Sequence, residues 1–108
     1  MAHYLVQGSY NSGSWTTQIQ NPQNRIDQVG KMFASKGVKI LTGFYAFGDF
    51  DLCLIIEGPD NVTAASALIA AAAGGALSKI QTTVLMTAEE GLDAIKGAGN
   101  VEYRPPST

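Results

Sequence analysis

Two side chains of this chain could carry acid–base chemistry, Asp51 and His3. Asp51 lies among apolar strand residues, where a partly desolvated carboxyl group could act as a base. The alternative is that it pairs with Arg25 or with a backbone amide and locks the local structure. This alternative is favoured, because structural ion pairs also place carboxylates in such positions. His3 is the only histidine and could shuttle a proton, although a histidine so close to a terminus is more commonly a surface residue.

Trp15, Arg25 and Tyr45, together with Asp51, are the candidates for binding a small molecule. Trp15 follows a serine-rich turn and suits the wall of a pocket. Tyr45 could line an apolar pocket, or it could belong to the core as part of an aromatic hairpin. Arg25 could clamp an anionic ligand, or it could be a solvated or interface residue.

The residue types that hold metals and cofactors are scarce. One histidine and one cysteine offer no spacing that matches a zinc or iron site. A haem needs an axial ligand, for which the terminal His3 is a poor candidate. Walker, Rossmann, nucleophile-elbow and Cys-x-x-Cys motifs do not occur. We therefore expect neither a metal nor a cofactor.

Composition limits the possible partners. Only 15% of the 108 residues are charged, against about 25% in a typical soluble domain, which suggests that another subunit covers part of the surface. A net charge of −2 without a basic run argues against nucleic acid or an acidic membrane as partner. The longest apolar run is too short to span a bilayer. The single Cys53 and the lack of a signal-peptide pattern are compatible with a cytoplasmic protein.

An aromatic hairpin is predicted between residues 44 and 57. Gly48-Asp49 fits a two-residue turn that places a positive φ at the glycine. This register pairs Phe47 with Phe50. It also pairs Tyr45 with Leu52, so that stacked side chains fix the alignment of the two strands.

The remaining patterns predict one domain over residues 1–97 and a loose tail over 98–108. Alternation indicates strands and capping residues indicate helices. The expected elements are a strand at 3–10, a short helix from Ser14, a helix starting at Asn21-Pro22 and stopped by Gly37, strands at 38–47 and 50–57, an alanine-rich helix at 61–73, a strand at 77–86, and a last helix opened by the capping box Thr87–Glu90.

This order predicts an α+β fold of the ferredoxin-like βαββαβ type, with the helices on one face of an antiparallel sheet. The two hairpin strands are apolar on both faces, and such strands are usually covered on both sides. The simplest cover is a second copy whose sheet packs against this one.

The chain resembles the GYD-domain family of dimeric α+β-barrel proteins. The resemblance is carried by Tyr4–Tyr10, Phe44–Asp51, Glu57–Asp60, the alanine-rich helix and Leu85–Glu90. The hairpin signature reads Gly48-Asp49-Phe50-Asp51, with Phe50 in place of the family's tyrosine. The resemblance implies a ferredoxin-like fold and sheet-to-sheet assembly, and says little about activity.

Two functions remain open. The first is an oligomer, homodimer or higher, that binds a small molecule between helices and sheet without catalysis. The second is a cofactor-independent enzyme of the monooxygenase or isomerase type, using Asp51 or His3 with Tyr45 and Trp15. The first needs only a pocket and is favoured, because the chain lacks a second histidine or a compact acid–base pair.

Overall fold

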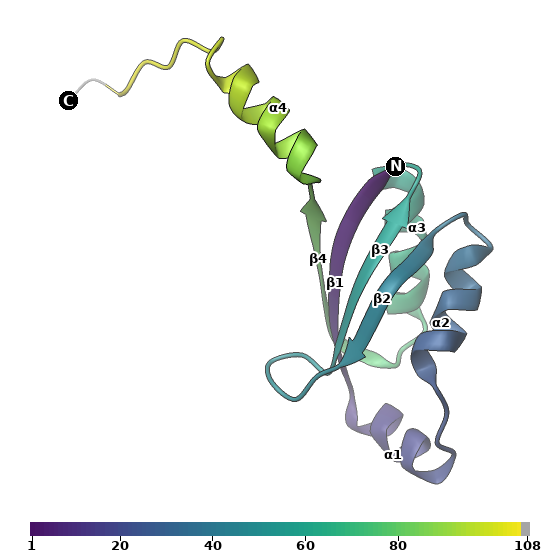
Figure 1. The fold of residues 1–108 in the computed structure, drawn as a ribbon. Helices are drawn as coiled ribbons and strands as arrows, with labels where there is room; N and C mark the ends of the chain where they lie inside the picture. The colour runs from purple at the N-terminus through teal and green to yellow at the C-terminus, as the bar shows by residue number, and fades with distance from the viewer. Residues whose placement is uncertain (107–108) are drawn as a thin grey trace.

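A four-stranded antiparallel sheet with helices against one face forms the body of the protein (Figure 1). The computed structural model describes residues 1–106. Its elements are β1 (Ala2–Tyr10), α1 (Ser12–Gln20), α2 (Arg25–Ala34), β2 (Lys39–Tyr45), β3 (Leu52–Gly58), α3 (Asn61–Ala73), β4 (Leu77–Leu85) and α4 (Ala88–Ala98).

The strands lie in the order β2-β3-β1-β4, and every neighbouring pair is antiparallel. This is the sheet order of the ferredoxin-like fold, so the predicted fold class is confirmed. The register of β2 shifts between Ile40 and Thr42, so Leu41 is an extra residue in a β-bulge. The bulge turns Ile40 and Gly43 toward the same face of the sheet, although they are three residues apart.

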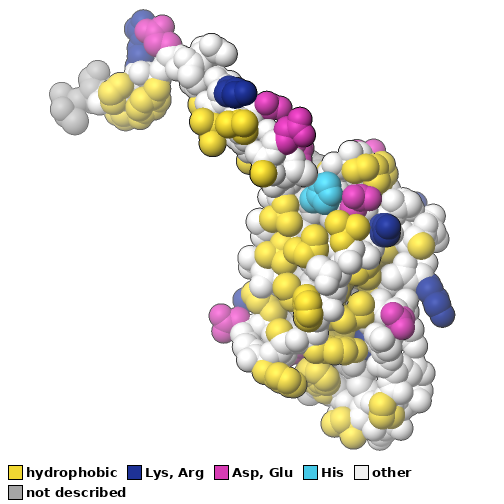
Figure 2. Space-filling view, viewed as in Figure 1, with side chains coloured by type: hydrophobic (Ala, Val, Ile, Leu, Met, Phe, Trp, Pro, Cys, Tyr) yellow, Lys and Arg dark blue, Asp and Glu magenta, His cyan; other side chains and the backbone are white. Residues whose placement is uncertain are grey.

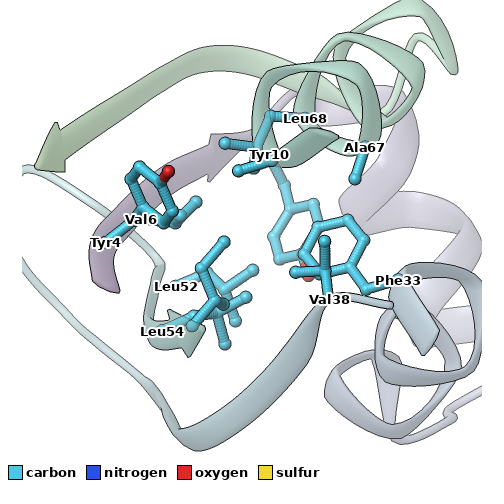
Figure 3. Packing of buried hydrophobic residues seen from close by; sticks show 11 residues of the cluster. Tyr4, Val6, Tyr10, Phe33, Val38, Leu52, Leu54, Ala67 and Leu68 are labelled. Atoms are coloured by element: carbon cyan, nitrogen blue, oxygen red, sulfur yellow. The ribbon is translucent and has the colours of Figure 1, made fainter. Parts of the chain in front are cut away.

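Alternate residues of β1 and β3 point toward the helices and form the core. Tyr4, Val6, Leu54 and Ile56 are all at most 4% exposed. From the helical layer, Phe33 of α2 and Leu68 of α3 complete the cluster (Figure 3). The apolar stripe of α2 and the small, helix-favouring alanines of α3 therefore supply the cover that the strand pattern requires.

Gly43 lets α2 approach the sheet closely. A Cβ atom at this position would lie 2.7 Å from Cδ2 of Leu54 and 3.1 Å from Cγ2 of Ile26. The first distance is shorter than real Cβ atoms show and the second is tight, so a larger residue would displace the Leu54 side chain of β3 and crowd Ile26 of α2.

The predicted hairpin register is correct at Tyr45–Leu52, but the predicted two-residue turn is wrong. Residues 46–51 form a wider loop, Gly48 does not adopt a positive φ, and Phe47 is fully exposed rather than paired with Phe50. The loop is held by contacts to β1 and β4 instead. Its carbonyl at Asp49 accepts a hydrogen bond from Ser9 Oγ at 3.0 Å, and Lys79 Nζ lies 4.7 Å from the Phe50 ring centroid.

The helix predicted to start at Asn21-Pro22 begins later. Asn24 is the N-cap of α2, and its side chain accepts the Asp27 amide. Asn21 instead ends α1, donating its backbone N–H to Thr17. Two Asn residues three positions apart both suit a cap, and the structure uses the second one. The helix ends before Gly37, which has a φ of 71°, as predicted.

The other face of the sheet carries no helix, and we call it the open face. By the strand register it presents His3, Leu5, Gln7, Ser9, Lys39, Thr42, Phe44, Cys53, Ile55, Glu57, Lys79, Gln81, Thr83 and Leu85. Apolar side chains gather across the side of the sheet seen in Figure 2. Phe44 is 65% exposed there.

Helix α4 projects away from the sheet and packs little against the other elements (Figure 1). The radius of gyration of 17.5 Å exceeds the roughly 13 Å of a compact domain of this length. Leu92 and Ile95 of this helix are exposed. Beyond α4 the chain is irregular up to residue 106, and the last part of the predicted tail, Ser107 and Thr108, lies outside the described residues.

Candidate functional site

Tyr10, at the end of β1, is the residue around which the candidate side chains gather. It lies on the helix side of the sheet and is 7% exposed. The ring of Trp15 meets it edge to face, with centroids 5.1 Å apart and an interplanar angle of 72°. Trp15 is in α1, which begins directly after the N-cap Asn11. The short β1–α1 connection therefore brings the two aromatic rings together.

Asp51 holds the end of the β1–β3 ladder. Its Oδ2 atom accepts a hydrogen bond from the backbone N–H of Tyr10 at 3.0 Å, and its own N–H donates to the Gly8 carbonyl at 2.8 Å. Strand β3 begins only at Leu52, which pairs with Gly8, so no backbone carbonyl of β3 pairs with Tyr10 in the ladder. The carboxylate satisfies that amide in place of a further strand residue.

Arg25 and Tyr45 are joined at the start of α2. The backbone N–H of Arg25 donates to the Tyr45 hydroxyl at 3.2 Å. The guanidinium Nη1 donates to Gln28 Oε1 at 2.5 Å. Gln28 lies one helical turn after Arg25, which is the spacing that lets two helical side chains meet.

The pKa of the Tyr10 phenol depends on burial and on three neighbouring side chains, Tyr45, Arg25 and Asp51. Burial raises its pKa, and neighbouring Tyr45 and Asp51 raise it further, while the charge and hydrogen bonding of Arg25 act in the opposite direction. Tyr10 is therefore a neutral hydrogen-bonding group at neutral pH. It links the backbone contact of Asp51 to the Arg25–Tyr45 pair.

An apolar cavity of about 250 Å³ lies between α2, α3 and the sheet, and Arg25 and Tyr10 are among its lining residues. Its walls come from β1, α2, β3, α3 and β4 and are mostly aliphatic. They include Val6, Val29, Met32, Leu52, Leu68 and Ile80. Among the described residues, Arg25 is the only charged one in this lining.

A second, polar cavity of about 400 Å³ adjoins the first beside α1. Hydroxyl and amide side chains line it, among them Ser14, Thr17 and Gln18. The two cavities share Arg25, Gly74 and Ala76. The guanidinium therefore lies where an apolar space and a polar space meet, and no carboxylate from residues 1–106 lines either one.

His3 is far from this site. It lies on the open face, opposite Glu57 and Leu85 in the register, and its Nε2 is 3.3 Å from Glu57 Oε2. Its Nδ1 is buried without a hydrogen-bond partner in the described part of the chain. Since a strand rises about 3.3 Å per residue, His3 and Asp51 are roughly 15–25 Å apart within one chain. The two candidate catalytic groups therefore do not form a pair in one chain.

The structure thus brings the four predicted binding residues to one end of the sheet, where they form two pairs with different contacts. Arg25 lines both cavities and Tyr45 bonds to it, whereas Trp15 and Asp51 contact Tyr10 and line neither cavity. Gln28, Val29 and Met32 were missed as lining residues. Their spacing of three, four and seven positions from Arg25 places them on the same helical face, and this periodicity could have found them.

Within residues 1–106, two further kinds of feature are absent. No group of three or more His, Cys, Asp or Glu side chains is arranged to hold a metal ion. No helix in the same range has the length and apolar character needed to cross a membrane.

The fold is shared with solved structures that differ greatly in sequence. MtbAldR matches with a TM-score of 0.58 and 13% identity over 80% of this chain and 53% of that protein, so this chain spans about half its length. TTHA0845 from Thermus thermophilus matches with a TM-score of 0.54 and 12% identity, over 82% of this chain and 96% of that one. The hypothetical protein PHS023 from Pyrococcus horikoshii gives 0.53 and 12%, over 81% and 92%. At these identities the likeness concerns the fold alone.

Sequence similarity identifies the family. No curated protein shows significant similarity to this chain. The GYD domain, however, matches residues 4–95, a range that contains nearly all of the sheet, the core, the loop 46–51 and the site around Tyr10. The chain belongs to the GYD-domain family.

Proposed function

We propose that this protein is a non-catalytic homo-oligomer, in the cytoplasm, that binds a small molecule between its helices and its sheet. The observation that carries the binding function is the cavity of about 250 Å³ with aliphatic walls and a single charged residue among those described. Ligand sites are typically concave, mostly apolar, and oriented by a few polar groups. The cavity has this character, at a volume just below the usual range of roughly 300–1,000 Å³, which suits a small ligand.

The arrangement of titratable groups supports binding rather than catalysis. Asp51 accepts a backbone hydrogen bond and lines neither cavity. A general base must reach the proton that it removes from a bound molecule, and neither Asp51 nor His3 lies in the cavity lining. A pocket alone is sufficient for the binding function.

A mass measurement tests the binding function directly. Protein purified under native conditions is compared by native and denaturing mass spectrometry. We expect a non-covalent mass that is present in the native spectrum and lost on denaturation. A matched variant, Leu68→Trp, fills the cavity wall and should abolish the extra mass. Retention of the same mass in a folded Leu68→Trp variant would place the ligand elsewhere and contradict the proposal.

The open face supports the oligomer. Phe44 is 65% exposed, and the chain has few charged residues to solvate such a surface. Exposed apolar patches of this kind mark interaction surfaces, and an isologous pairing of two open faces would cover both at once. Exposed Leu92 and Ile95 on α4 offer further apolar area for the partner.

Light scattering coupled to size exclusion tests the assembly. We expect at least a dimer at micromolar concentration. Phe44→Lys should shift the protein toward monomer, because it buries a charge in the interface. Val62→Lys is the matched control, since Val62 is an exposed residue of α3 on the other side of the sheet. A stable wild-type monomer would contradict assembly through the open face.

The cytoplasmic location rests on the single free Cys53.

A further inference from the structure

We infer that the ligand is a small amphipathic anion, with an apolar body in the 250 Å³ cavity and a monoanionic carboxylate head against Arg25. The inference rests on the proposed binding function and names its ligand class. It follows from the position of the guanidinium, which lies at the junction of an apolar and a polar cavity.

Arg25 has no acidic partner in the described chain. The ion pairs within residues 1–106 are His3–Glu57 and Arg104–Glu102. The polar contacts of Arg25 are with neutral groups. Its backbone N–H donates to the Tyr45 hydroxyl, its guanidinium Nη1 donates to Gln28 Oε1, and its side chain also acts on the neutral phenol of Tyr10. A guanidinium has five N–H donors in a planar fork, so donors remain for a carboxylate, which this fork binds in bidentate fashion.

The linings on either side of Arg25 fit the two ends of such a molecule. The apolar cavity has aliphatic walls that suit a short acyl or aromatic body. The polar cavity offers hydroxyl and amide groups, including Ser14, Thr17 and Gln23, that can solvate a head group. Because no Asp or Glu of the described residues lines either cavity, nothing in the lining repels an anion. A single cation matches a single negative charge.

Octanoate and 1-octanol separate the charge requirement from cavity binding. They share an apolar chain and differ in the head group. Binding is measured by isothermal titration calorimetry at neutral pH, with fluorescence of Trp15 as a second readout. We expect octanoate to bind about tenfold to hundredfold more tightly than octanol, the range expected for a charge-assisted hydrogen bond.

Arg25→Gln should remove this preference by weakening octanoate about tenfold or more while leaving octanol unchanged. Lys31→Gln is the matched control, since Lys31 is on the same helix and lines neither cavity. Equal binding of both probes to the wild type overturns the anion inference and leaves cavity binding intact. Binding of neither probe overturns the inference together with the proposed function for ligands of this size. The wild-type comparison holds even if Arg25→Gln fails to fold.

Discussion

The two faces of the sheet are built from alternate residues of the same strands, yet they differ in solvent exposure. On the helix side, Leu54 is 1% exposed. Its neighbour Ile55 points to the open face and is only half-buried. Across the strand pair, Gly43 lies tightly under α2, whereas the next residue, Phe44, is 65% exposed.

The difference shows what one chain can satisfy by itself. Two helices cover one face and leave a cavity between them and the sheet, whose lining includes the small residues Ala70 and Ala71 of α3. The open face mixes apolar side chains such as Ile55 and Phe44 with polar ones, and no helix of residues 1–106 covers it. The covered face therefore supports the stability of the single chain, while the open face is the surface on which we propose that copies associate.

The largest expected effect tests this division at adjacent residues. Leu54→Ala should lower the free energy of unfolding by about 2–5 kcal/mol, because it leaves a cavity in the core. Ile55→Ala should cost less, and its cost should depend on protein concentration, because in the proposed assembly Ile55 packs against another copy. Urea denaturation at several protein concentrations measures both. Equal, concentration-independent losses would show that the two faces are not different in this way.

The next effect concerns Asp51, which accepts the Tyr10 amide at the end of β1. Asp51→Ala should destabilise the protein by about 1.5–3 kcal/mol, the range for a hydrogen bond to a charged group, since the Tyr10 amide loses its acceptor. Asp51→Asn should recover part of this loss because its amide oxygen can still accept. Asp49→Ala, in the same loop, is the control and should change stability little. Thermal unfolding checks these values, and an unchanged Asp51→Ala variant would exclude the structural role.

Glycine substitutions compare the packed side of β2 with the exposed loop that follows it. Gly43→Ala should cost about 1–3 kcal/mol through overpacking, because its Cβ would lie 2.7 Å from Leu54 Cδ2 of β3 and 3.1 Å from Ile26 Cγ2 of α2. Gly48→Ala should be nearly neutral, since a Cβ there meets nothing within 4 Å and its φ is not positive. Chemical denaturation of the two variants side by side decides whether α2 is packed as closely as the structure shows.

The smallest effect compares a packed helix with an unpacked one through pH. Hydrogen bonds from Thr63 hold the pKa of Asp60 below its usual value, and hydrogen bonds from Thr87 do the same for Glu90. A carboxyl group with a lowered folded-state pKa stabilises the fold above its unfolded pKa of about 4, and the stabilisation is lost as pH falls through the folded value.

Asp60 caps α3, which packs on the sheet, so Asp60→Asn should reduce the pH dependence of global unfolding below about pH 4. Glu90→Gln should loosen only the start of α4, with no change in the global midpoint. Circular dichroism across an acid titration separates the two. A shift of the global midpoint in Glu90→Gln would mean that α4 is part of the cooperative unit.

Much of the fold was predictable because local signals agree with the global arrangement. The alanine-rich run predicted Asn61–Ala73, the bounds that α3 has. The capping box at Thr87 and Glu90 forms as predicted. The turn after Tyr45 could not be predicted from Gly48 alone, since side chains of Ser9 and Lys79, distant in sequence, hold the loop.

The site was predictable only in part. The aromatic and charged residue types pointed to Trp15, Arg25, Tyr45 and Asp51, and the fold brings them to one end of the sheet. Tyr10 was not singled out from the sequence, because nothing local distinguishes a strand-end tyrosine that meets both a helix and a loop. The junction of the two cavities at Arg25 depends on how α1, α2 and α3 meet, which strand and helix patterns do not contain.

The bulge at Leu41 has a consequence for how copies of this protein can meet. Strand β2 lies at one edge of the sheet, where a regular row of free N–H and C=O groups invites another strand to add on. A bulge interrupts that row and increases the local twist. Edge-to-edge growth into fibres is thereby disfavoured on this side, so crowded solutions should yield small closed assemblies rather than extended sheets.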